Sequence, residues 1–121
     1  MGATEVVQVG DDPLFEGLPE RFDVWQTHID EVSVAPSEAT MIAYNDHCAV
    51  QAMAIGDHCR SVQWHPEITR EIMDHYVCER VDVIDQAWGS GAAEALSARL
   101  PEHVESGAII AANFIRHFCL T

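Results

Sequence analysis

The residues best suited to do chemistry are a histidine and a glutamate separated by one proline, in His65-Pro66-Glu67. Proline disfavours helical geometry in the residue before it, so we expect His65 to be extended. Side chains two positions apart in an extended chain point to the same side, which would bring Glu67 beside His65. A carboxylate beside an imidazole fixes the ring's tautomer, and such a histidine can serve a nucleophile as general base and then general acid. Taken alone, the tripeptide is more typical of an exposed or packed histidine at a strand end.

A second pattern, Asp-His-Cys, occurs twice and contains residues that zinc favours as ligands. It ends once at Cys48 and once at Cys59. If the residues between them form a hairpin about Gly56, the two cysteines lie at opposite ends of it, on the order of 20 Å apart. We therefore expect no metal site, and no motif points to a cofactor. The four cysteines match neither a paired zinc motif nor a disulfide framework, which predicts reduced thiols.

The overall charge narrows the classes of partner. Among 121 residues, 20 are acidic and 6 are basic, for a net charge of −14. This balance argues against a nucleic-acid surface and against binding to anionic membranes. The chain contains neither the roughly 20-residue apolar run of a membrane span nor the pattern of a signal peptide at its start. We therefore expect a cytoplasmic protein.

Five short apolar runs in the first half predict the strands that would position these residues. The second strand leads into His28 and the last one ends at His65. Gly56, Asp57 and His58 separate the last two runs, which predicts an antiparallel hairpin. The predicted strands span residues 5–9, 22–28, 40–44, 49–55 and 60–65.

The second half has helical periodicity. Thr69 is placed to cap a helix that runs until the glycines after Trp88 break it. Two more helices are predicted over residues 92–100 and 102–119, separated by a proline. Strands over residues 1–68 followed by helices over 69–121 indicate one α/β unit without the alternation of a complete doubly wound fold.

The segments around the His65-Pro66-Glu67 tripeptide resemble those of a known family. Residues 63–67, Gln-Trp-His-Pro-Glu, resemble the Q-F-H-P-E signature of class I glutamine amidotransferases, with Trp64 in place of Phe. Residues 24–32, V-W-Q-T-H-I-D-E-V, followed by Pro36, resemble the family segment V-W-M-S-H-G-D-E-V…P in its GMP synthase-like variant.

Two further segments strengthen the resemblance. Residues 49–54 are similar to the family strand that precedes the signature and often carries a glutamine where Gln51 stands. Residues 12–19 resemble a D-P-L-F-x-G-L-P connection. The four segments lie in the family's order over residues 5–70, and the rest matches only a general pattern of closing helices. The resemblance implies the C-terminal half of a flavodoxin-like amidotransferase domain.

The resemblance also implies a reaction. Such proteins hydrolyse glutamine to glutamate and ammonia with a Cys-His-Glu triad, in which His65 and Glu67 match the histidine and glutamate. The backbone around Thr27, His28 and Ile29 matches a loop that helps to bind glutamine, although Ile29 replaces the family's glycine. The family's nucleophile lies upstream in a G-x-C-x-G elbow that this sequence lacks. We therefore expect negligible glutaminase activity from this chain alone.

Other interpretations of the same sequence remain open. Half of a parallel-sheet domain would leave a strand edge unpaired, which favours an assembly module that forms a homo-oligomer or complements a missing N-terminal half. A truncated reading frame without a function of its own is a further alternative. Trp25, Trp64 and Trp88 are predicted to be core or interface anchors. His28 and Asp30 are expected either to pair structurally or to contact an acceptor domain.

Overall fold

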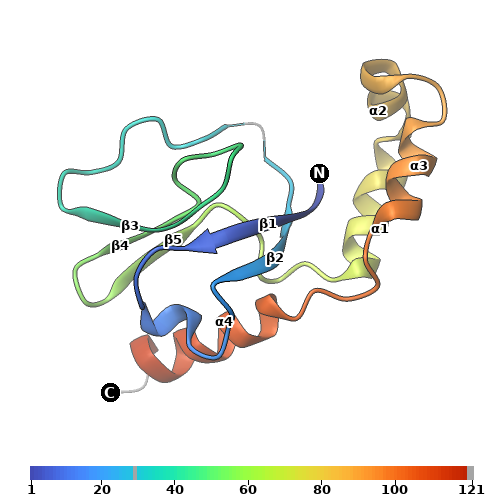
Figure 1. Ribbon diagram of the computed structural model, residues 1–121. Helices are drawn as coiled ribbons and strands as arrows, with labels where there is room; N and C mark the ends of the chain where they lie inside the picture. The colour runs from blue at the N-terminus through green and yellow to red at the C-terminus, as the bar shows by residue number, and fades with distance from the viewer. Residues whose placement is uncertain (29, 120–121) are drawn as a thin grey trace.

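A computed structural model describes residues 1–28 and 30–119 of the chain. Its centre is a five-stranded sheet in the order β2-β1-β3-β4-β5 (Figure 1), and every strand pair in the described part is antiparallel. The expectation that this chain is half of a parallel sheet with an unpaired strand edge is therefore wrong for the strand direction in this part of the chain. The strands are β1 (Gly2–Gln8), β2 (Arg21–Gln26), β3 (Ala39–Tyr44), β4 (Ala52–Ile55) and β5 (Cys59–Val62).

The helices occupy two places around the sheet. In Figure 1, α1, α2 and α3 form an arm to one side, while α4 runs beneath the strands. A short helical turn in the connection from β1 to β2 packs against α4. The elements are this turn, η1 (Pro13–Phe15), then α1 (Arg70–Glu79), α2 (Val81–Trp88), α3 (Ala92–Arg99), α4 (Ser106–Phe114) and a π-helical turn, η2 (Ile115–Cys119).

The main core lies between the sheet, η1 and α4. Val6 and Val24 of the β1–β2 hairpin are fully buried. Phe15, Phe22 and Trp64 form an aromatic cluster with ring centroids 5.5 to 6.0 Å apart. Aromatic rings bury large apolar areas and make favourable edge and tilted contacts. This cluster therefore holds the two edges of the sheet together, at β2 and beyond β5. The core prediction for Trp64 is confirmed.

The sheet curls until its two outer strands meet. β2 and β5 are at opposite edges in the strand order, yet the backbone N–H of His65, just after β5, donates to the carbonyl of Trp25 in β2 at 3.0 Å. A register irregularity between Met41 and Ala43 interrupts the β3–β4 ladder. Irregularities of this kind increase the local bend of a strand, which favours the curl.

A second core joins the arm to the sheet. Trp25 is 3% exposed and packs with Met73 and Val77 of α1 and with Ala93 and Leu100 at the two ends of α3. The core prediction for Trp25 is thus confirmed. Because Trp25 belongs to β2, the arm is tied to the strand that also meets His65.

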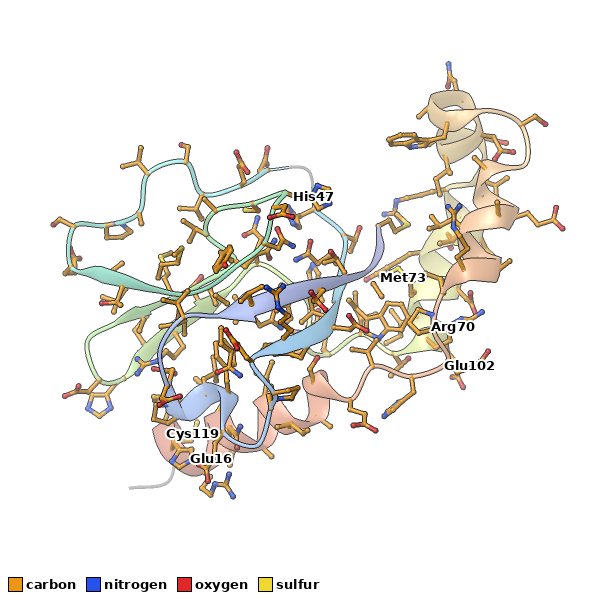
Figure 2. All side chains as sticks on the ribbon, viewed as in Figure 1. Glu16, His47, Arg70, Met73, Glu102 and Cys119 are labelled. Atoms are coloured by element: carbon orange, nitrogen blue, oxygen red, sulfur yellow. The ribbon has the colours of Figure 1, made fainter. Side chains whose placement is uncertain are left out.

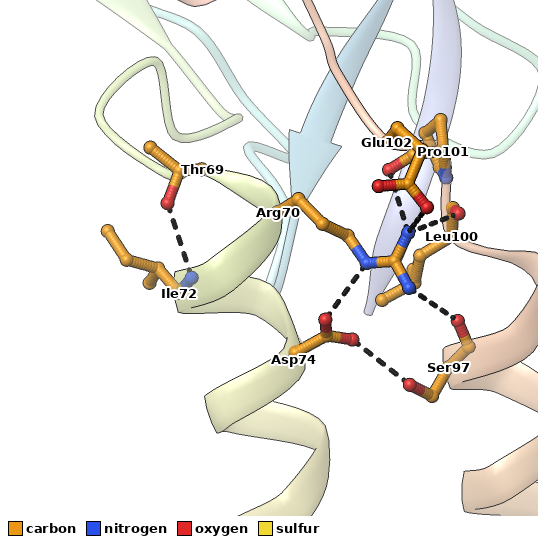
Figure 3. Close-up of polar contacts among 8 residues, drawn as sticks. All are labelled: Thr69, Arg70, Ile72, Asp74, Ser97, Leu100, Pro101 and Glu102. Carbon is orange, nitrogen blue, oxygen red and sulfur yellow. Dashed lines mark hydrogen bonds and ion pairs between the residues drawn. The ribbon is translucent and has the colours of Figure 1, made fainter.

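Arg70, in the first turn of α1, closes the base of the arm (Figure 3). Its guanidinium donates to Asp74 at 3.0 Å, to the carbonyl of Leu100 at 2.8 Å and to that of Ser97 at 3.3 Å, and it pairs with Glu102 at 3.2 Å. Ser97 in turn donates to Asp74 at 3.0 Å. These bonds satisfy carbonyls at the end of α3 and direct the chain toward α4.

The expected elements are largely confirmed, with differences at their ends. Thr69 caps α1 through a bond from the N–H of Ile72 to its hydroxyl at 3.3 Å, and the hairpin about Gly56 is present. The single helix predicted up to Trp88 is wrong, because Arg80 leaves helical geometry (φ −116°, ψ 19°) and separates α1 from α2. The apolar periodicity continues across Arg80, so the break has no signal in the sequence. The last helix begins at Ser106, four residues later than predicted.

The exposure of Trp88 and the length of the helices are two further features of the fold. Trp88 is 81% exposed, so of its two predicted places, core or interface, the core is wrong and the interface stays a prediction. None of the helices in the described residues is long and apolar enough to cross a membrane.

Replacing Arg70 by Ala is expected to lower the free energy of unfolding by about 2–3 kcal/mol, because the change removes the charged donor to the Asp74 carboxylate and to the partly buried carbonyls of Leu100 and Ser97. Urea denaturation followed by far-UV circular dichroism measures the change. Arg99→Ala, which removes an exposed arginine from α3, is the charge-matched control. Equal stability of the two variants would contradict the role given to Arg70.

Candidate functional site

The structure brings the histidine and glutamate of the tripeptide together. His65 Nδ1 and Glu67 Oε1 are 2.8 Å apart, and the two side chains are 38% and 67% exposed. A carboxylate only accepts hydrogen bonds, so a neutral His65 ring bonded to it carries its proton on Nδ1. The other ring nitrogen, Nε2, makes no hydrogen bond within the described residues.

Local geometry places this pair at the turn between β5 and α1. Trp64 points into the core, so the residues on either side of it, Gln63 and His65, face the opposite way. The N–H of Ile68 bonds to the carbonyl of His65 at 3.2 Å and closes the turn. The first turn of α1 follows at once. The pair is therefore held between a strand end and a capped helix start.

A polar network of four residues lies beside the pair, where β2 meets the end of β5. We define it as the glutamine network: Gln26, His28, Gln51 and Gln63. Gln63 donates to the carbonyl of Asp30 at 2.6 Å and lies 3.2 Å from His28 Nδ1. The same ring contacts the Asp30 carbonyl at 2.7 Å and Gln26 Oε1 at 3.2 Å. The pairing partner of His28 is thus the backbone of Asp30 rather than its carboxylate.

Gln51 anchors this network in the interior. It is 1% exposed, and its Oε1 accepts from Gln26 Nε2 at 2.6 Å. Its own Nε2 is buried without a partner in the described part of the chain. The sequence predicted no role in the site for Gln26, Gln51 or Gln63. The sequence does contain one sign of this network, since Gln51 is a polar residue inside the apolar run 49–55. A glutamine buried there needs a hydrogen-bonding partner.

The three residues expected to bind substrate have different outcomes. Thr27 is half-buried and His28 is exposed, and both lie directly beyond β2 next to the glutamine network. Ile29 lies outside the described residues. The contribution of this segment to glutamine binding stays a prediction.

The cysteines are not arranged as nucleophiles for His65. No hydrogen bond joins any of the four to His65 within the described residues. Cys59, Cys78 and Cys119 are exposed, whereas Cys48 is buried. Burial raises the pKa of the Cys48 thiol, and the nearby Glu31 carboxyl adds to the rise against the opposing effect of a bond to the Val50 carbonyl. Because the thiolate is the reactive form, Cys48 is expected to be inert.

The two Asp-His-Cys patterns lie on different elements. Cys48 precedes β4, whereas Cys59 begins β5 after the hairpin turn. In residues 1–28 and 30–119, no three His, Cys, Asp or Glu side chains gather closely enough to hold a metal ion.

Comparison with known proteins assigns the family. The family model described as "Glutamine amidotransferase class-I" matches residues 1–82, about two thirds of the chain. The chain belongs to the class I glutamine amidotransferase family. His65, Glu67 and the glutamine network all lie within the matched residues.

One relative of this amidotransferase chain is a glutamine-hydrolysing GMP synthase subunit of Methanoculleus marisnigri. The two are 40% identical over 84 residues, which make up 69% of this chain and 46% of the relative. The "GMP synthase [glutamine-hydrolyzing]" of Aeropyrum pernix is 38% identical over 81 residues, or 63% of this chain and 16% of the relative. The chain thus spans about half or less of these curated relatives.

A solved structure supports the same fold. A glutamine amidotransferase from Thermotoga maritima superimposes with a TM-score of 0.78 over 98% of this chain and 50% of its own, at 19% identity. The amidotransferase chain therefore has the fold of part of a class I domain, including the helices beyond residue 82.

Alkylation should separate the cysteines. At neutral pH we expect iodoacetamide to modify Cys48 at least about tenfold more slowly than the exposed Cys59, Cys78 and Cys119, because burial keeps its thiol protonated to a higher pH. Mass spectrometry of timed digests gives the four rates. The same reaction in urea is the control and should equalise them. A fast-reacting Cys48 in the folded chain would refute the assignment.

Proposed function

We propose that this chain supplies the histidine and glutamate of a glutamine-hydrolysing site, with glutamine as substrate. The proposal is carried by the 2.8 Å bond between His65 Nδ1 and Glu67 Oε1, which leaves Nε2 available. It is supported by the family of the chain and by relatives whose names describe glutamine-hydrolysing GMP synthases. A cytoplasmic location is part of the same proposal.

The reaction would proceed in two halves. His65 Nε2 takes the proton of a cysteine thiol as the sulfur attacks the side-chain carboxamide carbon of glutamine, and then gives that proton to the departing nitrogen, which leaves as ammonia. Water next attacks the thioester, with His65 again as base, and glutamate and the thiol are released. Glu67 holds the ring in the required tautomer and stabilises it when it is charged.

In this proposal the cysteine nucleophile comes from outside these 121 residues. The sequence contains no G-x-C-x-G elbow, and its own cysteines are bonded neither to His65 nor to each other in the described residues. Without a nucleophile and oxyanion donors, we expect negligible activity from this chain by itself. Complementation by a Cys-bearing N-terminal half would complete the site.

A second candidate function is assembly without catalysis. α2 has no buried residue, and its Val83 and Trp88 are 65% and 81% exposed. Trp88 also borders a cavity of about 440 Å³ with Met1, Ile84 and Leu96. Exposed tryptophan beside an apolar hollow is typical of protein–protein contacts, and we propose a homo-oligomer as the alternative state.

Glutaminase assays test the first function. The chain alone should release no glutamate above background. Mixed with an N-terminal fragment of the Methanoculleus marisnigri relative, it should gain activity that His65→Ala lowers about 10³-fold or more. Replacing Cys59 by Ser is the control and should leave that activity unchanged.

Two outcomes of this assay would revise the assignments. Turnover by the chain alone that survives His65→Ala would remove the role of His65. Turnover by the chain alone that His65→Ala abolishes would show that one of its own cysteines is the nucleophile.

Light scattering coupled to size-exclusion chromatography tests the assembly alternative. If α2 forms the contact, the chain elutes as an oligomer and Trp88→Ala shifts it toward monomer, because the substitution removes the largest exposed apolar side chain. Val34→Ala, at a valine that is 85% exposed outside α2, is the matched control. A monomer at high concentration would contradict this alternative.

A further inference from the structure

Helix α4 touches the catalytic turn at Gly107, where there is no room for a side chain. A Cβ atom built on Gly107 would lie 2.3 Å from the carbonyl oxygen of Pro66, the residue between His65 and Glu67. Gly107 has helical geometry without a positive φ, so the backbone conformation does not require glycine. Its role is therefore to allow the close approach of two backbones.

α4 cannot simply move away from this contact, because both of its ends are anchored. The Ser106 hydroxyl donates to the carbonyl of Asp23 in β2 at 2.6 Å. Farther along, the buried Asn113 donates to the carbonyls of Leu14 and Glu16 at 2.9 and 2.8 Å. A collision at Gly107 would thus be relieved on the side of Pro66.

Open space also borders this contact between the turn and α4. Two hollows, of about 410 and 290 Å³, flank Pro66 and Glu67, and both are also lined by Ala111 of α4. Trp25 and Thr69 line the larger hollow, whereas Leu14 and Val62 line the smaller one. The turn is therefore loosely packed on both sides of its contact with α4.

We propose that Gly107 is a positioning residue for the His65–Glu67 pair. A Cβ needs at least 3.0 Å, so alanine at this position would displace the Pro66 carbonyl by at least 0.7 Å. A shift of that size is enough to take a 2.8 Å bond beyond the roughly 3.2 Å range of good N–H···O hydrogen bonds. The significance of the residue rests on the proposed function, because the pair it positions is the proposed catalytic pair.

The test reads the tautomer of His65 by nitrogen-15 NMR of the full chain at about pH 8.5, where an ordinary imidazole is neutral. The wild type should show the Nδ1–H form, and Glu67→Ala should convert the ring to the Nε2–H form. Gly107→Ala is expected to lower the ratio of Nδ1–H to Nε2–H at least about threefold. Ala112→Gly, at an exposed position of α4, is the control and should keep the wild-type ratio.

The outcomes of this experiment test the His65–Glu67 pair and the role of Gly107 separately. A wild-type ring in the Nε2–H form would overturn the His65–Glu67 pair and the proposed function with it. A wild-type ring in the Nδ1–H form that Gly107→Ala leaves unchanged would overturn only the role of Gly107.

If Gly107→Ala does not fold, Ser106→Ala decides. It removes the bond that holds the first turn of α4 to β2 and adds no bulk. A loosened α4 should again lower the Nδ1–H to Nε2–H ratio of His65, whereas an unchanged ratio would overturn the proposal.

Discussion

The meeting of the two outer strands is the constraint on which the rest of the structure depends. A bond from the N–H of His65 to the carbonyl of Trp25 joins the end of β5 to β2, across the whole width of the sheet order. It places the His65-Pro66-Glu67 tripeptide next to the segment after β2, although about 40 residues separate them in the sequence. Trp25 also belongs to the second core, so the same closure ties the helical arm to the site.

Two kinds of packing hold the closure. Inside the curl, the rings of Phe15, Phe22 and Trp64 fill the space with apolar surface and keep the strands from flattening. Beneath it, Asn113 of α4 binds two carbonyls of the β1–β2 connection. Figure 2 shows side chains filling the space between the sheet and α4, and the labelled Glu16 and Cys119 lie near one another at one end of that space. Arg70 performs the equivalent function at the base of the arm, where Figure 3 shows its bonds.

The site itself combines one exposed pair with a partly buried support. His65 and Glu67 are accessible to solvent, whereas Gln51 is enclosed. The glutamine network connects this interior residue to His28 and to the carbonyl of Asp30, so the segment after β2 is held by side chains from three different strand regions. Hydrogen bonds of this kind behind a site hold its exposed side chains in a fixed geometry.

The sequence by itself determined the family, the order of strands and helices, the hairpin about Gly56, the Thr69 cap and the adjacency of His65 and Glu67, because each depends on local spacing or on a short motif. The tertiary structure decided what depends on distant residues. The curl of the sheet, the glutamine network, the break at Arg80 and the exposure of Trp88 are examples. A periodic pattern states that a residue is apolar, but not whether a partner surface covers it, so Trp25 and Trp88 were predicted alike and lie in opposite environments. Likewise, a glycine in a helix pattern does not reveal that the carbonyl of Pro66 approaches it.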